Sequence, residues 1–146
     1  MSTVITYGTF DLFHIGHLRL LERAAALGDR LFVGISTDEF NDVKGKACVQ
    51  PYDERAAIVA ALSVVDVVFP ESCWEQKVPD IQRIGADVFV MGADWAGEFD
   101  YLKAYCDVVY LKRTEGVSTT QRKELIGSGS WGKKKADEPL KEKEKP

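Results

Sequence analysis

The sequence has few of the features that mark disulfide-rich, membrane-spanning or zinc-binding proteins. Its three cysteines are odd in number and lie far apart without a CxxC pair, so neither a disulfide framework nor a zinc ribbon is indicated. No apolar run is long enough to span a bilayer and no signal peptide is evident, so we expect a cytoplasmic protein. Because the chain has only two histidines, a zinc site with three histidine ligands is excluded.

Common nucleotide-binding and nucleic-acid-binding patterns are also missing. There is no GxxxxGK[ST] loop and no GxGxxG fingerprint placed between a strand and a helix, which disfavours a P-loop ATPase and a standard dinucleotide oxidoreductase. A net charge of −4 is unsuited to the basic surface that nucleic acids require. We therefore expect no nucleic-acid partner and no insertion into a membrane.

The composition divides the chain into one domain and a tail. The 146 residues, 45% of them hydrophobic, suit a single core that removes about two thirds of the unfolded surface from water. We assign residues 1–126 to this domain. Residues 127–146 are rich in Gly, Ser, Lys and Glu and should be disordered, because they have little to bury. The lysine triplet at 133–135 could touch a membrane surface or RNA, but a solvated tail is the favoured interpretation.

Short apolar runs alternate with amphipathic segments along the domain. Strands are predicted at 3–7, 31–35, 64–69, 88–91 and 108–111, and helices at 14–27, closed by Gly28, at 53–62, at 74–84 and from 118 onward. This alternation predicts an α/β protein: a single doubly wound, Rossmann-like domain with a five-stranded, mostly parallel sheet. Its ligand site should lie at the carboxyl ends of the strands.

The stretch at 8–17, Gly-Thr-Phe-Asp-Leu-Phe-His-Ile-Gly-His, joins the first strand to the first helix. His14 and His17 lie three residues apart and should share one face of the first helical turn, where they could meet one anion. Gly8 and Gly16 would let the backbone approach such a ligand. Two alternatives remain open: the histidines are only a helix cap or surface residues, or they join Asp11 in a metal site.

Two further stretches carry candidate phosphate contacts. Lys44 and Lys46 flank a glycine in a basic loop, which is either ordinary exposed charge or a source of mobile cations beside phosphate oxygens. In the stretch 113–120, Ser118 and Gln121 form a capping-box pattern at a helix start. The same hydroxyl and N–H groups can hold phosphates, with Arg113 adding a fork-shaped donor.

These stretches resemble a known family. Residues 8–17 resemble the HxGH signature of the nucleotidyltransferase superfamily, and residues 113–120 resemble the RTxGxSTT signature of its cytidylyltransferase branch. Residues 35–41, 74–77 and 90–95 are similar to the glycerol-3-phosphate cytidylyltransferase family. The resemblance covers roughly residues 1–126, without evident gaps.

The resemblance implies an enzyme, in which a phosphate oxygen of sn-glycerol 3-phosphate attacks the α-phosphate of CTP in line. Pyrophosphate leaves and CDP-glycerol forms, which in this family feeds teichoic acid or similar polymers. It also implies Mg²⁺ on the triphosphate and a homodimer. The alternatives are a cytidylyl- or adenylyltransferase for another acceptor, such as ethanolamine phosphate, ribitol or sugar phosphate, or FMN, and a non-catalytic CTP sensor.

The resemblance also assigns roles to residues. The catalytic candidates are His14, His17, Lys46 and Arg113. The nucleotide-binding candidates are Gly8, Thr9, Phe10, Asp11, His14, Gly16, His17, Lys46, Asp94, Arg113, Thr114, Gly116, Ser118, Thr119 and Thr120, and the acceptor-binding candidates are Lys44 and Lys77. Arg55 matches a family arginine, whereas Ser63 stands where the family has another arginine, a departure that bears on the choice of acceptor.

Overall fold

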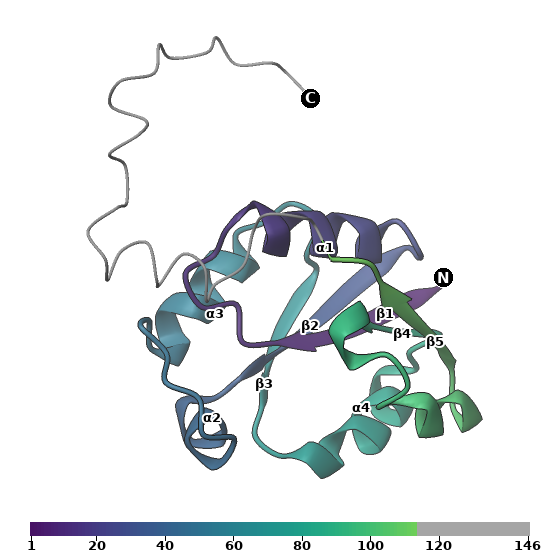
Figure 1. The fold of residues 1–146 in the computed structure, drawn as a ribbon. Coiled ribbons are helices and arrows are strands. Elements are labelled where there is room, and N and C mark those ends of the chain that lie inside the picture. Colours follow the sequence, from purple (N-terminus) through teal and green to yellow (C-terminus); the bar gives the residue numbers. More distant parts are fainter. Residues whose placement is uncertain (114–146) are drawn as a thin grey trace, which may run out of the picture.

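Five strands form one sheet in residues 1–113, the part of the chain that this computed structural model describes. They are β1 (Thr3–Gly8), β2 (Arg30–Ser36), β3 (Val67–Glu71), β4 (Val88–Gly92) and β5 (Asp107–Leu111). Every pairing is parallel, and the strand order is β3-β2-β1-β4-β5. The predicted doubly wound α/β sheet is therefore confirmed (Figure 1).

Strand β1 lies at the centre of the sheet, where the order of the strands reverses. The chain builds outward from β1 through β2 and β3, and then continues on the other side of β1 with β4 and β5. Open α/β sheets bind ligands in the crevice outside the carboxyl ends of the strands at such a reversal. Gly8 and Gly92, the last residues of β1 and β4, mark this crevice.

Helices cover both faces of the sheet (Figure 1). They are α1 (Ile15–Ala25), α2 (Asp38–Val43), α3 (Tyr52–Ala60) and α4 (Lys77–Ile84), with 3₁₀ turns at Trp74–Gln76, Ala93–Trp95 and Asp100–Ala104. Val4 of β1 is buried in one core cluster with Leu21 of α1, whereas Ile5 is buried in a second cluster with Ile81 of α4. Successive strand residues point to opposite faces, so the apolar runs of the sheet are buried on both sides.

Strand β3 differs from the strand predicted at 64–69. The first part of that apolar run is a turn, in which the Val65 N–H donates to the Leu62 carbonyl at 3.1 Å and Val65 is buried in the core. The strand then runs on through Pro70 to Glu71. Proline is tolerated there because β3 is an edge strand, with a ladder on one side only.

Two of the predicted helices also differ in detail. The segment 74–84 is a 3₁₀ turn followed by α4, whose first turn contains Pro79, where a proline is accepted. Helix α1 ends at Ala25, before the predicted stop at Gly28. A side chain at Gly28 would collide with Val4, because a Cβ there would lie 2.8 Å from the Val4 Cγ2 atom.

Helix α2 was not predicted, because it is short and lies in a polar stretch. The Thr37 side chain caps it by accepting a hydrogen bond from the Phe40 N–H at 3.1 Å. The helix ends at Val43, so the basic loop begins at Lys44. The remaining predicted strands and the helix at 53–62 are confirmed to within about two residues.

Two sequence predictions concern the rest of the chain. The helix from residue 118 and the tail at 127–146 lie outside the described residues. Within residues 1–113, no helix has the length and apolar character needed to cross a membrane.

Candidate active site

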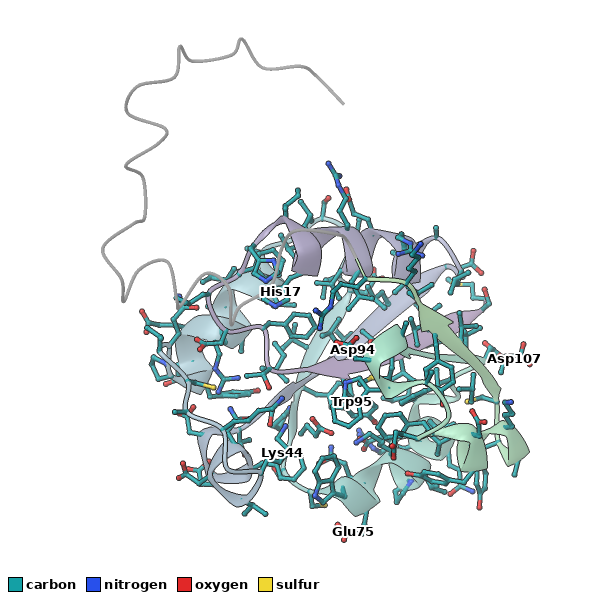
Figure 2. The ribbon with its side chains drawn as sticks, in the orientation of Figure 1. His17, Lys44, Glu75, Asp94, Trp95 and Asp107 are labelled. Carbon is teal, nitrogen blue, oxygen red and sulfur yellow. The ribbon has the colours of Figure 1, made fainter. Side chains whose placement is uncertain are left out.

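A cavity of about 480 Å³ lies at the carboxyl ends of β1 and β4, a volume within the usual range for small-molecule sites. The labelled side chains of His17, Lys44, Asp94 and Trp95 surround this region, whereas Asp107 lies at the periphery (Figure 2). Every described residue that the sequence assigned to the site lines the cavity: Gly8, Thr9, Phe10, Asp11, His14, Gly16, His17, Lys44, Lys46, Lys77, Asp94 and Arg113.

The loop after β1 has an unusual backbone. Phe10 and Leu12 have positive φ angles of 55° and 48°, a conformation that costs energy in residues other than glycine and is held by surrounding contacts. The Phe10 ring folds over Gly8, where a Cβ would lie 2.7 Å from the Phe10 Cε2 atom. Gly8 is thus needed so that Phe10 can form one wall of the cavity.

The buried side chain of Arg55 fixes the position of this loop through hydrogen bonds to backbone carbonyls. Its side chain is fully buried, and it donates hydrogen bonds to the carbonyls of Thr9 at 2.9 Å and Ser36 at 2.7 Å. It also donates to the Gln50 carbonyl at 3.0 Å and to Asp38 Oδ1 at 2.8 Å. One guanidinium therefore joins the ends of β1 and β2 to the start of α3.

Asp11 ties the same loop to the segment after the basic loop. Its carboxylate oxygens accept hydrogen bonds from the backbone N–H groups of Val49 at 2.8 Å and Gln50 at 3.0 Å. The Gln50 side chain in turn accepts from the Leu12 N–H at 3.0 Å. Asp11 is 4% exposed, and these contacts give it a positioning role; its predicted role toward the nucleotide stays a prediction.

The two histidines form a reciprocal cap at the start of α1. The Gly16 N–H donates to His14 Nδ1 at 3.0 Å, and the His14 N–H donates to His17 Nδ1 at 3.2 Å. The two rings stack with their centroids 3.8 Å apart. Because each Nδ1 accepts a hydrogen bond, the proton of each neutral ring is carried on Nε2. Both histidines therefore cap α1, and each neutral ring carries Nε2–H as its donor group.

His17 is neutral in the free protein. Its ring lies between Phe10, at 5.5 Å between centroids, and Phe13, at 5.3 Å. Burial is the main cause that lowers the pKa of His17 to about 3, and the neighbouring His14 lowers it too, while Asp11 opposes them. A neutral donor at the positive end of a helix suits an anion without requiring a proton transfer.

The metal alternative finds no support in the described part of the chain. Within residues 1–113, no group of three His, Cys, Asp or Glu side chains is arranged to hold a metal ion. The carboxylate of Asp11 is directed to backbone N–H groups, and each histidine presents its Nδ1 to the helix cap.

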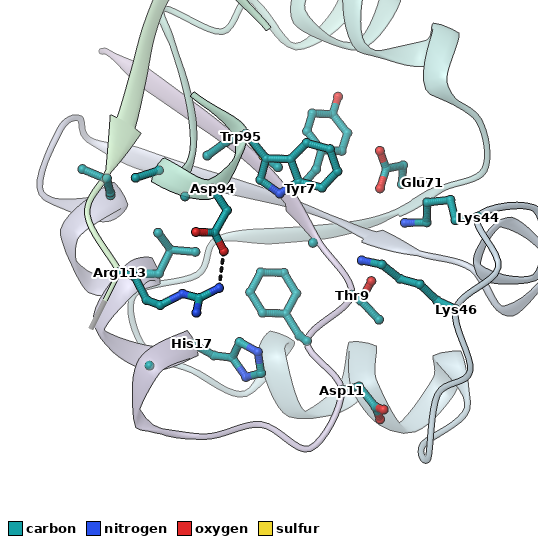
Figure 3. Close-up of a pocket in the computed structure, with 18 of the residues that line it drawn as sticks. Tyr7, Thr9, Asp11, His17, Lys44, Lys46, Glu71, Asp94, Trp95 and Arg113 are labelled. Atoms are coloured by element: carbon teal, nitrogen blue, oxygen red, sulfur yellow. Dashed lines mark hydrogen bonds and ion pairs between the residues drawn. The ribbon is translucent and has the colours of Figure 1, made fainter. Parts of the chain in front are cut away.

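Arg113 and Asp94 meet across the mouth of the cavity. The Arg113 guanidinium donates to the Asp94 carboxylate, and both side chains are more than half exposed (Figure 3). Asp94 follows β4 and Arg113 follows β5, so the pair joins neighbouring strand ends. An exposed ion pair of this kind contributes little to stability and can be exchanged for contacts with a ligand.

Lys44 and Lys46 point into the cavity from the side opposite Arg113 (Figure 3). The Lys44 ammonium lies 4.5 Å from the ring centroid of Phe40 and 5.7 Å from that of Trp74. Burial, more than the neighbouring Lys46 and Lys77, lowers the pKa of Lys44 to about 8, while Glu71 raises it. Cationic groups therefore face the cavity from both sides.

Lys77 is buried at the far end of the cavity. Its Nζ donates to Glu71 Oε2 at 2.7 Å, and both side chains are nearly inaccessible. The ammonium lies 4.8 Å from the ring centroid of Tyr7 and 5.3 Å from those of Trp74 and Phe99. Sequence reasoning singled out Lys77 but missed Glu71, Tyr7 and Phe99. Glu71 is the last residue of β3, and residues at the carboxyl ends of parallel strands are candidates for ligand contacts. The predicted strand ended at residue 69, so this signal was missed.

Some predicted positions lie elsewhere. Thr114, Gly116, Ser118, Thr119 and Thr120 lie outside the described residues. Ser63 is exposed in the turn after α3 and is absent from the lining of the cavity. Its effect on the acceptor, if there is one, is therefore not through direct contact within this cavity.

A family model and curated relatives indicate one family for this chain, and a solved structure shares its fold. A family model described as cytidylyltransferase-like matches residues 5–128. The glycerol-3-phosphate cytidylyltransferase of Bacillus subtilis is 59% identical over 126 residues, which cover 86% of this chain and 98% of that protein. The Staphylococcus aureus enzyme of the same name is 53% identical over 128 residues, covering 87% and 97%. A solved structure of a lipopolysaccharide core biosynthesis protein from Thermoplasma volcanium has a TM-score of 0.64 at 24% identity, covering 78% of this chain and 97% of that one, a likeness of fold.

Proposed function

The chain belongs to the cytidylyltransferase-like family, and from this premise we propose that it transfers CMP from CTP to sn-glycerol 3-phosphate. A phosphate oxygen of the acceptor forms a bond to the α-phosphorus of CTP. The bond from that phosphorus to the oxygen bridging the β-phosphate breaks, and pyrophosphate leaves with the electron pair. The product is CDP-glycerol, and no covalent enzyme intermediate is needed.

The observation that carries this proposal is the stacked histidine pair at the start of α1. Both rings line the cavity, and each has the tautomer that makes Nε2–H a donor. The α-phosphate becomes more crowded and redistributes its charge in the five-coordinate transition state. Donors fixed on a helix turn stabilise that state better than ground-state CTP, because they need no reorganisation during the reaction.

The cations support the placement of the remaining phosphates. Lys46 lines the cavity and approaches it beside Thr9 (Figure 3), where its flexible ammonium can follow the charge on the departing pyrophosphate. Arg113 can exchange Asp94 for phosphate oxygens in a fork-shaped contact. Asp94 then becomes available to accept a hydrogen bond from the ribose or the exocyclic amine of cytosine.

We infer that Mg²⁺ arrives on the triphosphate as part of the substrate. Bound there, it would neutralise part of the phosphate charge. Among the described residues, no group of His, Cys, Asp or Glu side chains is arranged as a separate metal site. The residues of the chain position the reacting groups, which is the main requirement of phosphoryl-transfer chemistry.

Lys44 and Lys77 are proposed to hold the phosphate of the acceptor. Both line the same end of the cavity, and both approach the ring of Trp74, at 5.7 and 5.3 Å from its centroid. Two ammonium groups can overcome the repulsion between the acceptor phosphate and the triphosphate. Replacing either lysine with Ala should weaken use of the acceptor more than binding of CTP.

We also propose a homodimer and a cytoplasmic location, both from the resemblance of the sequence to its family. Sedimentation of the purified protein tests the first, and a single species of monomer mass would refute it. We find no observation that favours another phosphorylated acceptor or a CTP sensor.

The experiment that tests the function is a matrix of four nucleotides against phosphorylated acceptors, with Mg²⁺ and pyrophosphate release as the readout. We expect CTP with glycerol 3-phosphate to give the highest kcat/KM. A higher kcat/KM with ATP and FMN, or with ethanolamine phosphate, would change the substrates assigned to the enzyme but not the reaction type. Binding of CTP without turnover on any acceptor would favour a sensor.

A further inference from the structure

Glu71 is a buried carboxylate that the mechanism above does not use. It is 4% exposed and lines the cavity (Figure 3). Its Oε2 accepts the hydrogen bond from Lys77 Nζ, which is the one hydrogen bond of this carboxylate within residues 1–113. No buried side-chain oxygen in that range lacks a partner. Oε1 has no hydrogen-bond partner among these residues, so it keeps accessible surface, and Glu71 lines the cavity.

Lys77 keeps a fixed position beside this carboxylate. Its ammonium lies among the rings of Tyr7, Trp74 and Phe99, which we call the aromatic cage. The Tyr7 hydroxyl donates to Asp80 Oδ2 at 2.8 Å, which holds that ring in place. An aromatic cage with a carboxylate attracts cations. Because Lys77 already fills it, a second ammonium group from a substrate would meet a like charge.

The charges at this end of the cavity orient an acceptor. Lys44 and Lys77 carry two positive charges and Glu71 one negative charge. A phosphate is attracted by the ammonium groups and repelled by the Glu71 carboxylate. A hydroxyl group can donate to Oε1, an acceptor-only atom. The favoured orientation therefore has the acceptor phosphate toward the histidines and its hydroxylated tail toward Glu71.

We propose that Glu71 is a specificity-determining residue for the acceptor, with Oε1 accepting a hydrogen bond from a hydroxyl of the acceptor tail while Oε2 keeps Lys77 in the aromatic cage. This inference rests on the proposed function and states what the site selects: a phosphate ester with a neutral, hydroxylated tail. Propyl phosphate lacks the hydroxyl, and ethanolamine phosphate replaces it with an ammonium group. Both are poor acceptors on this account.

The test compares glycerol 3-phosphate with propyl phosphate in the wild type and in Glu71→Gln. The glutamine carbonyl can still accept from Lys77, while its NH₂ group turns the cavity-facing acceptor into a donor. We expect kcat/KM for glycerol 3-phosphate to fall about ten- to a hundredfold, the range for a lost hydrogen bond to a charged group, mainly through KM. Propyl phosphate should change far less, and the Kd for CTP should stay constant. Glu75→Gln, an exposed carboxylate outside the cavity, is the matched control and should behave as wild type.

The outcomes separate the possible failures. Equal losses on both acceptors, or a parallel loss of CTP affinity, would overturn the inference and make Glu71 a support for Lys77 or the fold. If circular dichroism shows that Glu71→Gln is unfolded, the wild type alone decides: a preference of at least about tenfold for glycerol 3-phosphate over propyl phosphate supports the inference, and equal kcat/KM overturns it. A wild type that uses neither acceptor with CTP overturns the proposed function as well.

Discussion

Replacing His17 with asparagine separates the two uses of its imidazole. The asparagine Oδ1 can take the place of Nδ1 and accept the His14 N–H, which now donates across 3.2 Å. No atom of asparagine reaches the position of Nε2, so the proposed donor to the α-phosphate is lost while the helix cap is kept. Glutamine in the same place reaches further and should restore part of the donor.

The expected loss follows from the fixed position of the donor. The ring is held by a stack on His14 at 3.8 Å and by contacts with Phe10 and Phe13 at 5.5 and 5.3 Å. Removing one donor that is preorganised in this way costs on the order of a hundred- to a thousandfold in kcat, or ~3–4 kcal/mol. The Kd for CTP should change by only a few fold, because the interaction strengthens in the transition state.

The assay is kcat at saturating CTP and acceptor, with the Kd for CTP from calorimetry and circular dichroism as a folding control. The pKa of about 3 means that roughly one ring in ten thousand is protonated at pH 7. His17 should therefore contribute no step to the pH profile of kcat/KM near pH 6.5. Any step seen there in the wild type should persist in His17→Asn. A near-normal kcat for His17→Asn would remove His17 from catalysis and refute the reasoning.

Raising the pH above 8 should deprotonate Lys44, whose pKa is about 8. The KM for the acceptor should therefore rise between pH 8 and 9 in the wild type but not in Lys44→Arg. Parallel pH dependence of KM in the two proteins would contradict this. Arg55→Met removes four hydrogen bonds of a fully buried guanidinium and should lower the free energy of unfolding in urea by about 3–5 kcal/mol, whereas a loss below about 1 kcal/mol would show that the bonds are dispensable. Asp94→Asn should raise the Kd for CTP about tenfold in calorimetry if Asp94 accepts a hydrogen bond from the nucleotide, whereas tighter binding would show that it only restrains Arg113.

The sheet could be predicted from sequence because its signals are local. Buried parallel strands are short apolar runs, and those of β1, β2, β4 and β5 are bounded by polar or glycine residues. The run before β3 has no such boundary, and burial of Val65 in a turn has the same apolar pattern as burial in a strand. The strand was therefore placed too early, and Glu71 was left out of the candidate site.

The lining residues could be predicted where a local stretch or the family resemblance pointed to them, but their geometry could not. The three-residue spacing of the histidines placed both rings on the first turn of α1. Their stacking, and the burial that keeps His17 neutral, depend on how Phe10 folds back with a positive φ angle. Arg55 donates a hydrogen bond to the carbonyl of Thr9, which lies 46 positions earlier in the chain. Such long-range contacts leave no periodic trace in a single sequence.

The most direct test of the central claim is product analysis with CTP, glycerol 3-phosphate and Mg²⁺ together. Mass spectrometry should detect CDP-glycerol in a one-to-one ratio with released pyrophosphate, and omission of the acceptor should abolish both. Pyrophosphate release with free CMP as the product, or without any acceptor, would show that water and not the acceptor phosphate attacks the α-phosphorus. That result would contradict the proposed transfer.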